Sequence, residues 1–133
     1  MKIFIDTNVI ISAILNPNGT PCAAYLKATT NGNQGVICEQ NVDELRRIFQ
    51  KKFPHKLFAL EKFLYNTKLE IVPVPEATIV SEKNIRDVAD RPILRAALFA
   101  EAEILLTGDK DFLEATLFKP KIMNAATFLQ MIL

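Results

Sequence analysis

Four acidic side chains occur where the predicted elements begin or end, and they are Asp6, Glu44, Asp90 and Asp109. Asp6 ends an apolar run of strong β preference, residues 3–5, and Asp109 closes a second apolar run. An acid at the end of a buried strand needs a partner, because burial penalises an unpaired charge. Clustered carboxylates repel one another, and divalent cations relieve that repulsion. Oxygen-only ligands suit Mg²⁺ or Mn²⁺ better than zinc, and two such ions can promote phosphodiester hydrolysis.

Short apolar runs alternate with helical patterns along the chain. We expect strands at residues 2–5, 35–38, 70–72, 103–106 and 121–123. We expect helices at about 8–15, 20–28, 41–52, 56–66, 90–102 and 111–115. Thr7 or Asn8 would cap the first of them. A last helix follows the cap Asn124, and its residues Phe128, Leu129 and Ile132 should face inward. Residues 76–86 predict an irregular segment or a short helical turn. This alternation favours an α/β fold, with a parallel sheet between helices on both faces.

The predicted topology brings the acids towards one edge of the sheet. The carboxyl ends of parallel strands border the ligand crevice, so Asp6 and Asp109 should meet there. The helix starts that carry Glu44 and Asp90 can lie at the same edge if the crossovers are right-handed. Taken singly, Asp90 and Asp109 could be caps or turn residues, and Glu44 a solvated residue beside Asp43. Together they favour a four-acid metal pocket.

Composition narrows the class of protein. The 133 residues predict a single domain spanning residues 1–133, and half of them are hydrophobic. The net charge of +1 means that attraction to nucleic acid would come from local patches and metal. Cys22 and Cys38 form no metal spacing or disulfide framework, which favours reduced thiols in a cytosolic protein. Since no apolar stretch approaches about 20 residues and the N-terminus lacks a signal-peptide pattern, we expect a cytoplasmic protein without membrane contact.

A basic stretch begins directly after Glu44 and comprises Arg46, Arg47, Lys51, Lys52, Lys56 and Lys62. It can be a solvated helical face, or a rim that contacts phosphate groups. Both interpretations remain open at this stage. His55, the only histidine, is expected at the surface, because a two-metal site needs no histidine base.

Four segments of the chain resemble the motifs of PIN-domain nucleases, in order and at ordinary spacing, namely Phe4–Val9 followed by Ser12, Cys38–Leu45, Arg86–Leu94 and Ile104–Phe112. The resemblance is closest to the small VapC-like proteins described as toxins of toxin–antitoxin systems. It implies a three-layer α/β/α sandwich with a central parallel sheet of about five strands. It also implies metal-dependent endonucleolytic cleavage of RNA, with one or two Mg²⁺ or Mn²⁺ ions. The implied partners are an RNA substrate, a small antitoxin protein and a second copy of the chain.

The resemblance also assigns roles to individual residues. The acids that bind metal and carry catalysis would be Asp6, Glu44, Asp90 and Asp109, with Asp111 as a further metal ligand and Thr7, Asn8 and Thr107 as polar support. Arg91 stands where many relatives have a second acid, and it either lowers the local negative charge or contacts a phosphate. Asp87 can replace the missing acid or cap the helix. Further candidates for phosphate contacts are Arg46, Arg47 and Lys110.

Two alternatives compete with the ribonuclease hypothesis. A weak or inactive PIN scaffold would bind RNA or a protein partner without cutting, and Arg91 favours this alternative. A haloacid-dehalogenase-type phosphatase also begins with a strand that ends in Asp. That chemistry needs an acid two residues later and another four residues after the Gly-Asp aspartate, whereas this chain has Asn8 and Leu113.

Overall fold

A parallel sheet runs through the centre of the computed structural model, which describes residues 1–131. Its five strands are β1 (Lys2–Ile5), β2 (Gln34–Cys38), β3 (Glu70–Val72), β4 (Ile104–Leu106) and β5 (Lys121–Met123). Their order is β3-β2-β1-β4-β5, and every neighbouring pair is parallel. The structure therefore confirms the predicted five-stranded parallel sheet.

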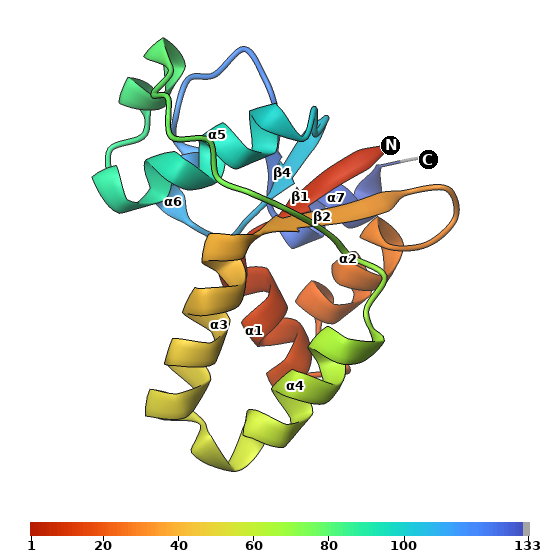
Figure 1. Ribbon diagram of the computed structural model, residues 1–133. Helices are drawn as coiled ribbons and strands as arrows, with labels where there is room; N and C mark the ends of the chain where they lie inside the picture. The colour runs from red at the N-terminus through yellow and green to blue at the C-terminus, as the bar shows by residue number, and fades with distance from the viewer. Residues whose placement is uncertain (132–133) are drawn as a thin grey trace.

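Helices cover both faces of the sheet and complete the predicted three layers (Figure 1). One face is covered by α1 (Thr7–Leu15), α2 (Thr20–Ala28), α3 (Glu39–Lys52), α4 (Leu57–Asn66) and α7 (Ala125–Gln130). The other face is covered by α5 (Arg91–Phe99) and α6 (Lys110–Leu113), together with the 3₁₀ turns Val80–Asn84 and Val88–Asp90. A third 3₁₀ turn, Pro54–Lys56, joins α3 to α4. Within residues 1–131, no helix combines the length and apolarity needed to cross a membrane.

The side chains of β1 explain why its sequence is a continuous apolar run. Ile3 and Ile5 enter the core beneath α1 to α4, while Phe4 enters the core beneath α5. All three side chains are fully buried. A strand that is buried on both faces shows no polar alternation, as is typical of parallel sheets covered by helices.

The sheet changes its winding direction at β1. From β1 the chain proceeds to β2 and β3 on one side, and then crosses over to β4 and β5 on the other. The loops after β1 and β4 consequently diverge and leave a crevice between them, which is where open α/β sheets bind ligands. Asp6 follows β1 and Asp109 lies three residues after β4, so both reach this crevice.

Several predicted boundaries need correction. The cap of α1 is Asp6, neither Thr7 nor Asn8, because the Asp6 carboxylate accepts a hydrogen bond from the Thr7 backbone N–H. Helix α5 ends at Phe99, ahead of the predicted end at residue 102. The backbone turns away there, since Glu101 adopts a φ of 58°.

The C-terminal helix is partly as predicted. Asn124 caps α7 through a hydrogen bond of 2.8 Å from the Thr127 backbone N–H. Phe128 is buried, but Leu129 is exposed, because the short helix presents only one face to the sheet. Ile132 lies outside the described residues. The segment 76–86 contains the expected short turn, Val80–Asn84.

A buried ion pair anchors this segment to α5. Arg95 Nε lies 2.8 Å from Glu82 Oε2, and the two side chains are only 14% and 7% exposed. Arg95 Nη1 also donates to the backbone carbonyls of Pro75, at 2.8 Å, and Glu76, at 3.2 Å. One arginine thus holds two parts of the connection that leads to Asp87.

We expect the Arg95→Met variant to lose about 3–5 kcal/mol of unfolding free energy, because it leaves the Glu82 carboxylate buried without its partner. Urea denaturation of the purified chain measures this loss. The double variant Glu82→Gln/Arg95→Met should recover part of it, because no buried charge remains. If single and double variants lose the same amount, the carbonyl contacts and not the ion pair stabilise the segment.

Candidate metal centre

Asp6 forms the floor of the crevice and is only 7% exposed. Its Oδ1 accepts a hydrogen bond from the Thr7 backbone N–H at 2.8 Å. Its Oδ2 accepts from Thr107 Oγ1 at 2.8 Å and from Asn8 Nδ2 at 3.0 Å. Burial raises the pKa of Asp6, the three hydrogen bonds lower it, and the nearby charge of Asp109 raises it further. Two donors from the start of α1 and one from the loop after β4 therefore fix the orientation of this carboxylate.

Asn8 and Thr107 join the start of α1 to the loop that follows β4. Asn8 Oδ1 accepts from the Gly108 backbone N–H at 2.9 Å, while its Nδ2 donates to Asp6. Thr107 is fully buried, and its Oγ1 accepts from the Asp109 backbone N–H at 3.0 Å. These contacts hold Asp6 and Asp109 in one rigid arrangement.

Asp90 occupies the cap position of α5 without capping it. Its side chain makes no cap hydrogen bond, and Oδ2 is a buried oxygen without a hydrogen-bond partner among the described residues. Burial, a hydrogen bond with the Asp109 carboxyl group and the charges of Asp109, Asp87 and Asp6 raise the pKa of Asp90 to about 7. A buried carboxylate oxygen without a protein partner is available to a cation or to a water molecule.

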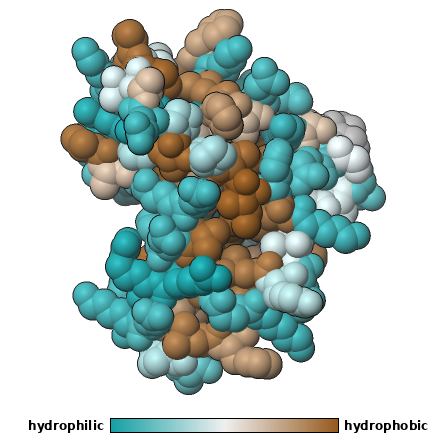
Figure 2. Space-filling view, in the orientation of Figure 1, coloured by the Kyte–Doolittle hydropathy of each residue, from teal (hydrophilic) through white to brown (hydrophobic). Residues whose placement is uncertain are grey.

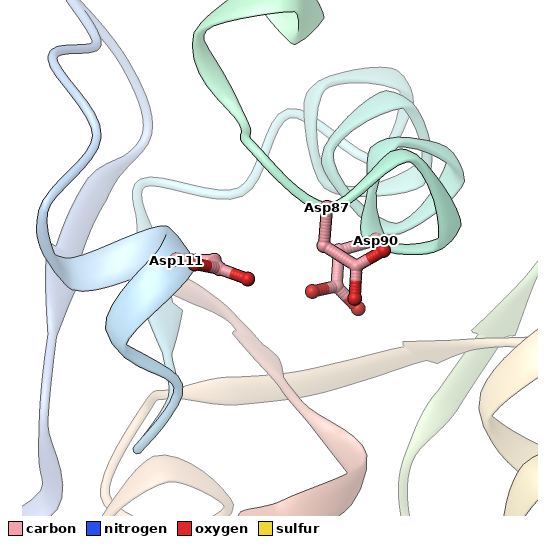
Figure 3. A group of neighbouring side chains, drawn as sticks. All are labelled: Asp87, Asp90 and Asp111. Carbon is pink, nitrogen blue, oxygen red and sulfur yellow. The ribbon is translucent and has the colours of Figure 1, made fainter.

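Asp111 joins this group from the opposite side of the crevice. One carboxylate oxygen from each of Asp87, Asp90 and Asp111 lies within 4.8 Å of the other two. Figure 3 shows the Asp111 carboxylate projecting from α6 towards the two acids that precede α5. Asp87 also caps the turn Val88–Asp90, since it accepts a hydrogen bond of 3.0 Å from the Ala89 backbone N–H. Asp87 thus both caps a turn and joins the acidic group.

Glu44 approaches the same centre from α3. Burial and the charge of Asp6 raise the pKa of Glu44, while Arg47 and hydrogen bonding from Gln40 and Thr7 lower it. The charge of Asp6 thus acts on both Glu44 and Asp90, and that of Asp109 acts on both Asp6 and Asp90. Asp111 joins Asp90 and Asp87 through the 4.8 Å group described above.

The four basic residues proposed for phosphate contacts differ in whether they have a partner within the protein. Arg46 forms a bidentate pair with Glu61 at 3.0 and 3.1 Å, which joins α3 to α4. Arg91 Nε donates to the Ile85 carbonyl at 3.0 Å and so fixes the loop before Asp87. Lys110 and Arg47 are exposed, and hydrophilic side chains cover α3 in Figure 2. Two of the four candidates therefore have intramolecular partners.

Sequence reasoning missed Arg86 as a residue of this site. Its guanidinium pairs with the Asp111 carboxylate, and its side chain is 79% exposed. Arg86 belongs to the segment Arg86–Leu94, but residue types alone do not indicate that it reaches α6.

A cavity of about 430 Å³ opens beside the acids, and it is lined by Asn8, Val9, Ser12, Pro21, Gly108, Asp109 and Ala125. A cavity of about 450 Å³ between α1, α2 and α4 has no acidic lining residue.

The residues present fit a hard divalent cation. The donors are carboxylate oxygens, burial together with their mutual repulsion raises the pKa of three of the acids, and Asp90 Oδ2 has no protein partner among the described residues. Mg²⁺ and Mn²⁺ prefer this kind of ligand and retain water in their remaining positions.

A family model for the PIN domain matches residues 2–111. The chain belongs to the PIN domain family. This membership decides against the phosphatase alternative. No curated protein matches the chain.

Several solved structures share the fold of this PIN domain. VapBC2 from Rickettsia felis bound to a promoter DNA fragment is 20% identical, with a TM-score of 0.68 over 93% of this chain and 98% of that chain. FitAcB from Neisseria gonorrhoeae is 24% identical, with a TM-score of 0.61, and the match covers 89% of this chain and 97% of that chain. DNA-bound VapBC from Salmonella typhimurium is 18% identical, with a TM-score of 0.67, and the match covers 94% of this chain and 98% of that chain.

The metal-free PIN domain should lose stability as the pH rises from 3.8 to about 7, the interval between the ordinary and the raised pKa of Asp90. In this interval the folded chain binds more protons than the unfolded chain, so the free energy of unfolding falls with increasing pH. Asp6 and Glu44 act in the same direction, because their pKa values are raised as well.

Urea denaturation in EDTA at several pH values measures this slope. Adding Mg²⁺, or replacing Asp90 by Asn, should flatten it, because either change removes the repulsion. An unfolding free energy that increases over this interval without metal would contradict the proposed acid cluster.

Proposed function

We propose that the chain is a Mg²⁺- or Mn²⁺-dependent endoribonuclease that acts as the toxin of a toxin–antitoxin pair. The observation that carries this proposal is the unpaired, buried oxygen of Asp90, next to Asp109 and within 4.8 Å of carboxylate oxygens of Asp87 and Asp111. A structural cluster would pair such an oxygen with a donor, whereas a metal centre leaves it for the cation. Membership of the PIN domain family supports a nuclease over other metal-dependent enzymes.

We assign the side chains of the crevice to three tasks. Asp6, Glu44, Asp90, Asp109 and Asp111 would hold one or two ions. Asn8, Thr107 and Thr7 would orient Asp6 through the hydrogen bonds described above. A bound Mg²⁺ or Mn²⁺ supplies positive charge that offsets the charge of the phosphodiester and promotes the attack of water on it. In the metal-free chain, burial and the neighbouring acids raise the pKa of Asp90 to about 7, so a cation at Asp90 would compete with a proton near neutral pH.

Arg86 is our candidate for the contact with the substrate phosphate. In the metal-free chain it pairs with Asp111, and its side chain is largely exposed at the rim of the crevice. If Asp111 held a metal ion, its pair with Arg86 would weaken, and the guanidinium would be available to a phosphate, for which its planar fork is suited. The chain has a net charge of only +1, so a local contact of this kind would supply the attraction to RNA.

The proposed partners follow from the similar structures. VapBC2 and VapBC were each solved bound to DNA. We infer that this chain also has a small inhibitory partner and forms a homodimer. A short upstream reading frame encoding a DNA-binding protein would support the toxin role.

The second candidate is a PIN scaffold that binds RNA or a protein without cutting. Arg91 favours this alternative, because it replaces an acid that many relatives have beside Asp90. However, Asp87 contributes a carboxylate to the same acidic group, so the number of acids is maintained. A titration of Mg²⁺ and Mn²⁺ against RNA cleavage separates the two candidates, because a scaffold leaves RNA intact at every metal concentration.

Asp6→Asn and Asp90→Asn should each reduce RNA cleavage by more than about 100-fold, because each removes a charge that holds the cation. Both variants should keep the fold, and the metal-free protein should gain stability, because repulsion within the cluster decreases. Cleavage of a labelled RNA and thermal unfolding in EDTA measure the two effects.

The neighbouring pair Glu44 and Asp43 provides a matched control. Glu44→Gln should impair cleavage, whereas Asp43→Asn should not, since Asp43 is exposed on α3. Unchanged cleavage in both Asp6→Asn and Asp90→Asn would refute the assignment of the site.

Arg86→Ala should raise the KM for RNA by about tenfold, the effect of losing one charged hydrogen bond, with a smaller change in kcat. Its affinity for Mn²⁺ should stay the same or increase, because Asp111 loses its competing partner. Arg46→Ala is the control, since Arg46 is paired with Glu61. A parallel loss of metal affinity and RNA binding would show that Arg86 only supports the local structure.

A further inference from the structure

Asn41 is a fully buried polar residue that lies next to the metal centre without belonging to the acid cluster. It is the third residue of α3. Its Oδ1 accepts hydrogen bonds from the Cys38 backbone N–H at 2.9 Å and from Cys38 Sγ at 3.1 Å. Its Nδ2 donates to Thr7 Oγ1 at 2.8 Å, and this bond joins α3 to the start of α1.

The orientation of the Asn41 amide follows from these partners. A backbone N–H can only donate, so the amide atom that faces Cys38 N must be the oxygen. The amide nitrogen therefore faces Thr7, and the Thr7 hydroxyl must accept this bond. Because a hydroxyl has a single hydrogen, that hydrogen remains available for a second partner. Asn41 thus determines which way the Thr7 hydroxyl points.

Glu44 is positioned to be that second partner. It follows Asn41 by three residues on α3, so both side chains lie on the same face of the helix. Hydrogen bonding from the Thr7 side chain is one of the influences that lower the pKa of Glu44, which places the Thr7 hydroxyl near the Glu44 carboxyl group. The Thr7 backbone N–H donates to Asp6 Oδ1 at 2.8 Å. Thr7 therefore donates to one acid with its backbone N–H, and its hydroxyl lies near a second acid.

We propose that Asn41 is a positioning residue of the metal centre, which holds the Thr7 hydroxyl as a donor to Glu44 and so sets Glu44 relative to Asp6. The inference rests on the metal centre of the proposed function. It assigns to Asn41 a role beyond capping α3, because the cap uses only Oδ1. The bond from Nδ2 to Thr7 has no part in the cap and crosses to another helix.

The experiment is a double-mutant cycle with Asn41→Leu, Thr7→Val and the double variant, each prepared as the full chain. The readout is Mn²⁺ affinity, measured by electron paramagnetic resonance, together with urea denaturation in EDTA. Each single variant should weaken Mn²⁺ binding by about 10- to 100-fold, as expected for the loss of a group that orients ligands. The double variant should bind Mn²⁺ no more weakly than Thr7→Val, because Asn41 acts through Thr7.

Asn124→Ala is the matched control, because it also removes an asparagine cap but at α7. It should lose stability without losing Mn²⁺ affinity. If Asn41→Leu does the same, Asn41 is only a cap and the proposal is overturned. Additive losses in the double variant would overturn it as well, since the two residues would then act independently.

The wild-type chain separates this inference from the proposed function. If it binds Mn²⁺ but leaves RNA intact, the ribonuclease proposal fails, while the cycle still tests Asn41. If it binds Mn²⁺ and cuts RNA while Asn41→Leu binds Mn²⁺ normally, only the inference about Asn41 fails. If it binds no Mn²⁺, both fail.

Discussion

The burial of a carboxylate at the switch point of the sheet is the constraint on which the rest of the structure depends. Asp6 is nearly inaccessible to solvent, so its charge must be compensated within the protein. Hydrogen bonds from Thr7, Asn8 and Thr107 supply part of this compensation. They do not compensate the neighbouring charge of Asp109, and the acid cluster therefore remains under electrostatic strain that a cation relieves.

The elements around Asp6 supply its partners from three directions. The β4 loop carries Thr107 and Asp109, α3 carries Glu44, and the connection before α5 carries Asp90. This connection is held by the buried pair of Glu82 and Arg95, not by strand pairing. A centre assembled in this way depends on packing far from the acids themselves, because a shift of α5 would move Asp90 away from Asp109.

The positive charge near the acids comes from individual arginines, since the net charge of the chain is only +1. Some arginines already have partners within the protein, as Arg46 does with Glu61 and Arg91 with the Ile85 carbonyl. Arg86 is different, because its partner Asp111 belongs to the acid cluster. If Asp111 held a metal ion as proposed, its pair with Arg86 would weaken, and the guanidinium would be available to a phosphate without a basic surface.

The sequence by itself determined the five parallel strands and the two strand ends that carry Asp6 and Asp109, because fully buried strands and their terminating acids are local signals. Only the tertiary structure decided the partners of individual side chains. Asp90 stands at a cap position without capping, Asp87 joins Asp111, and Asn41 reaches Thr7 across two helices. Such pairings depend on the distance between atoms far apart in the chain, and residue type and spacing carry no information about that distance.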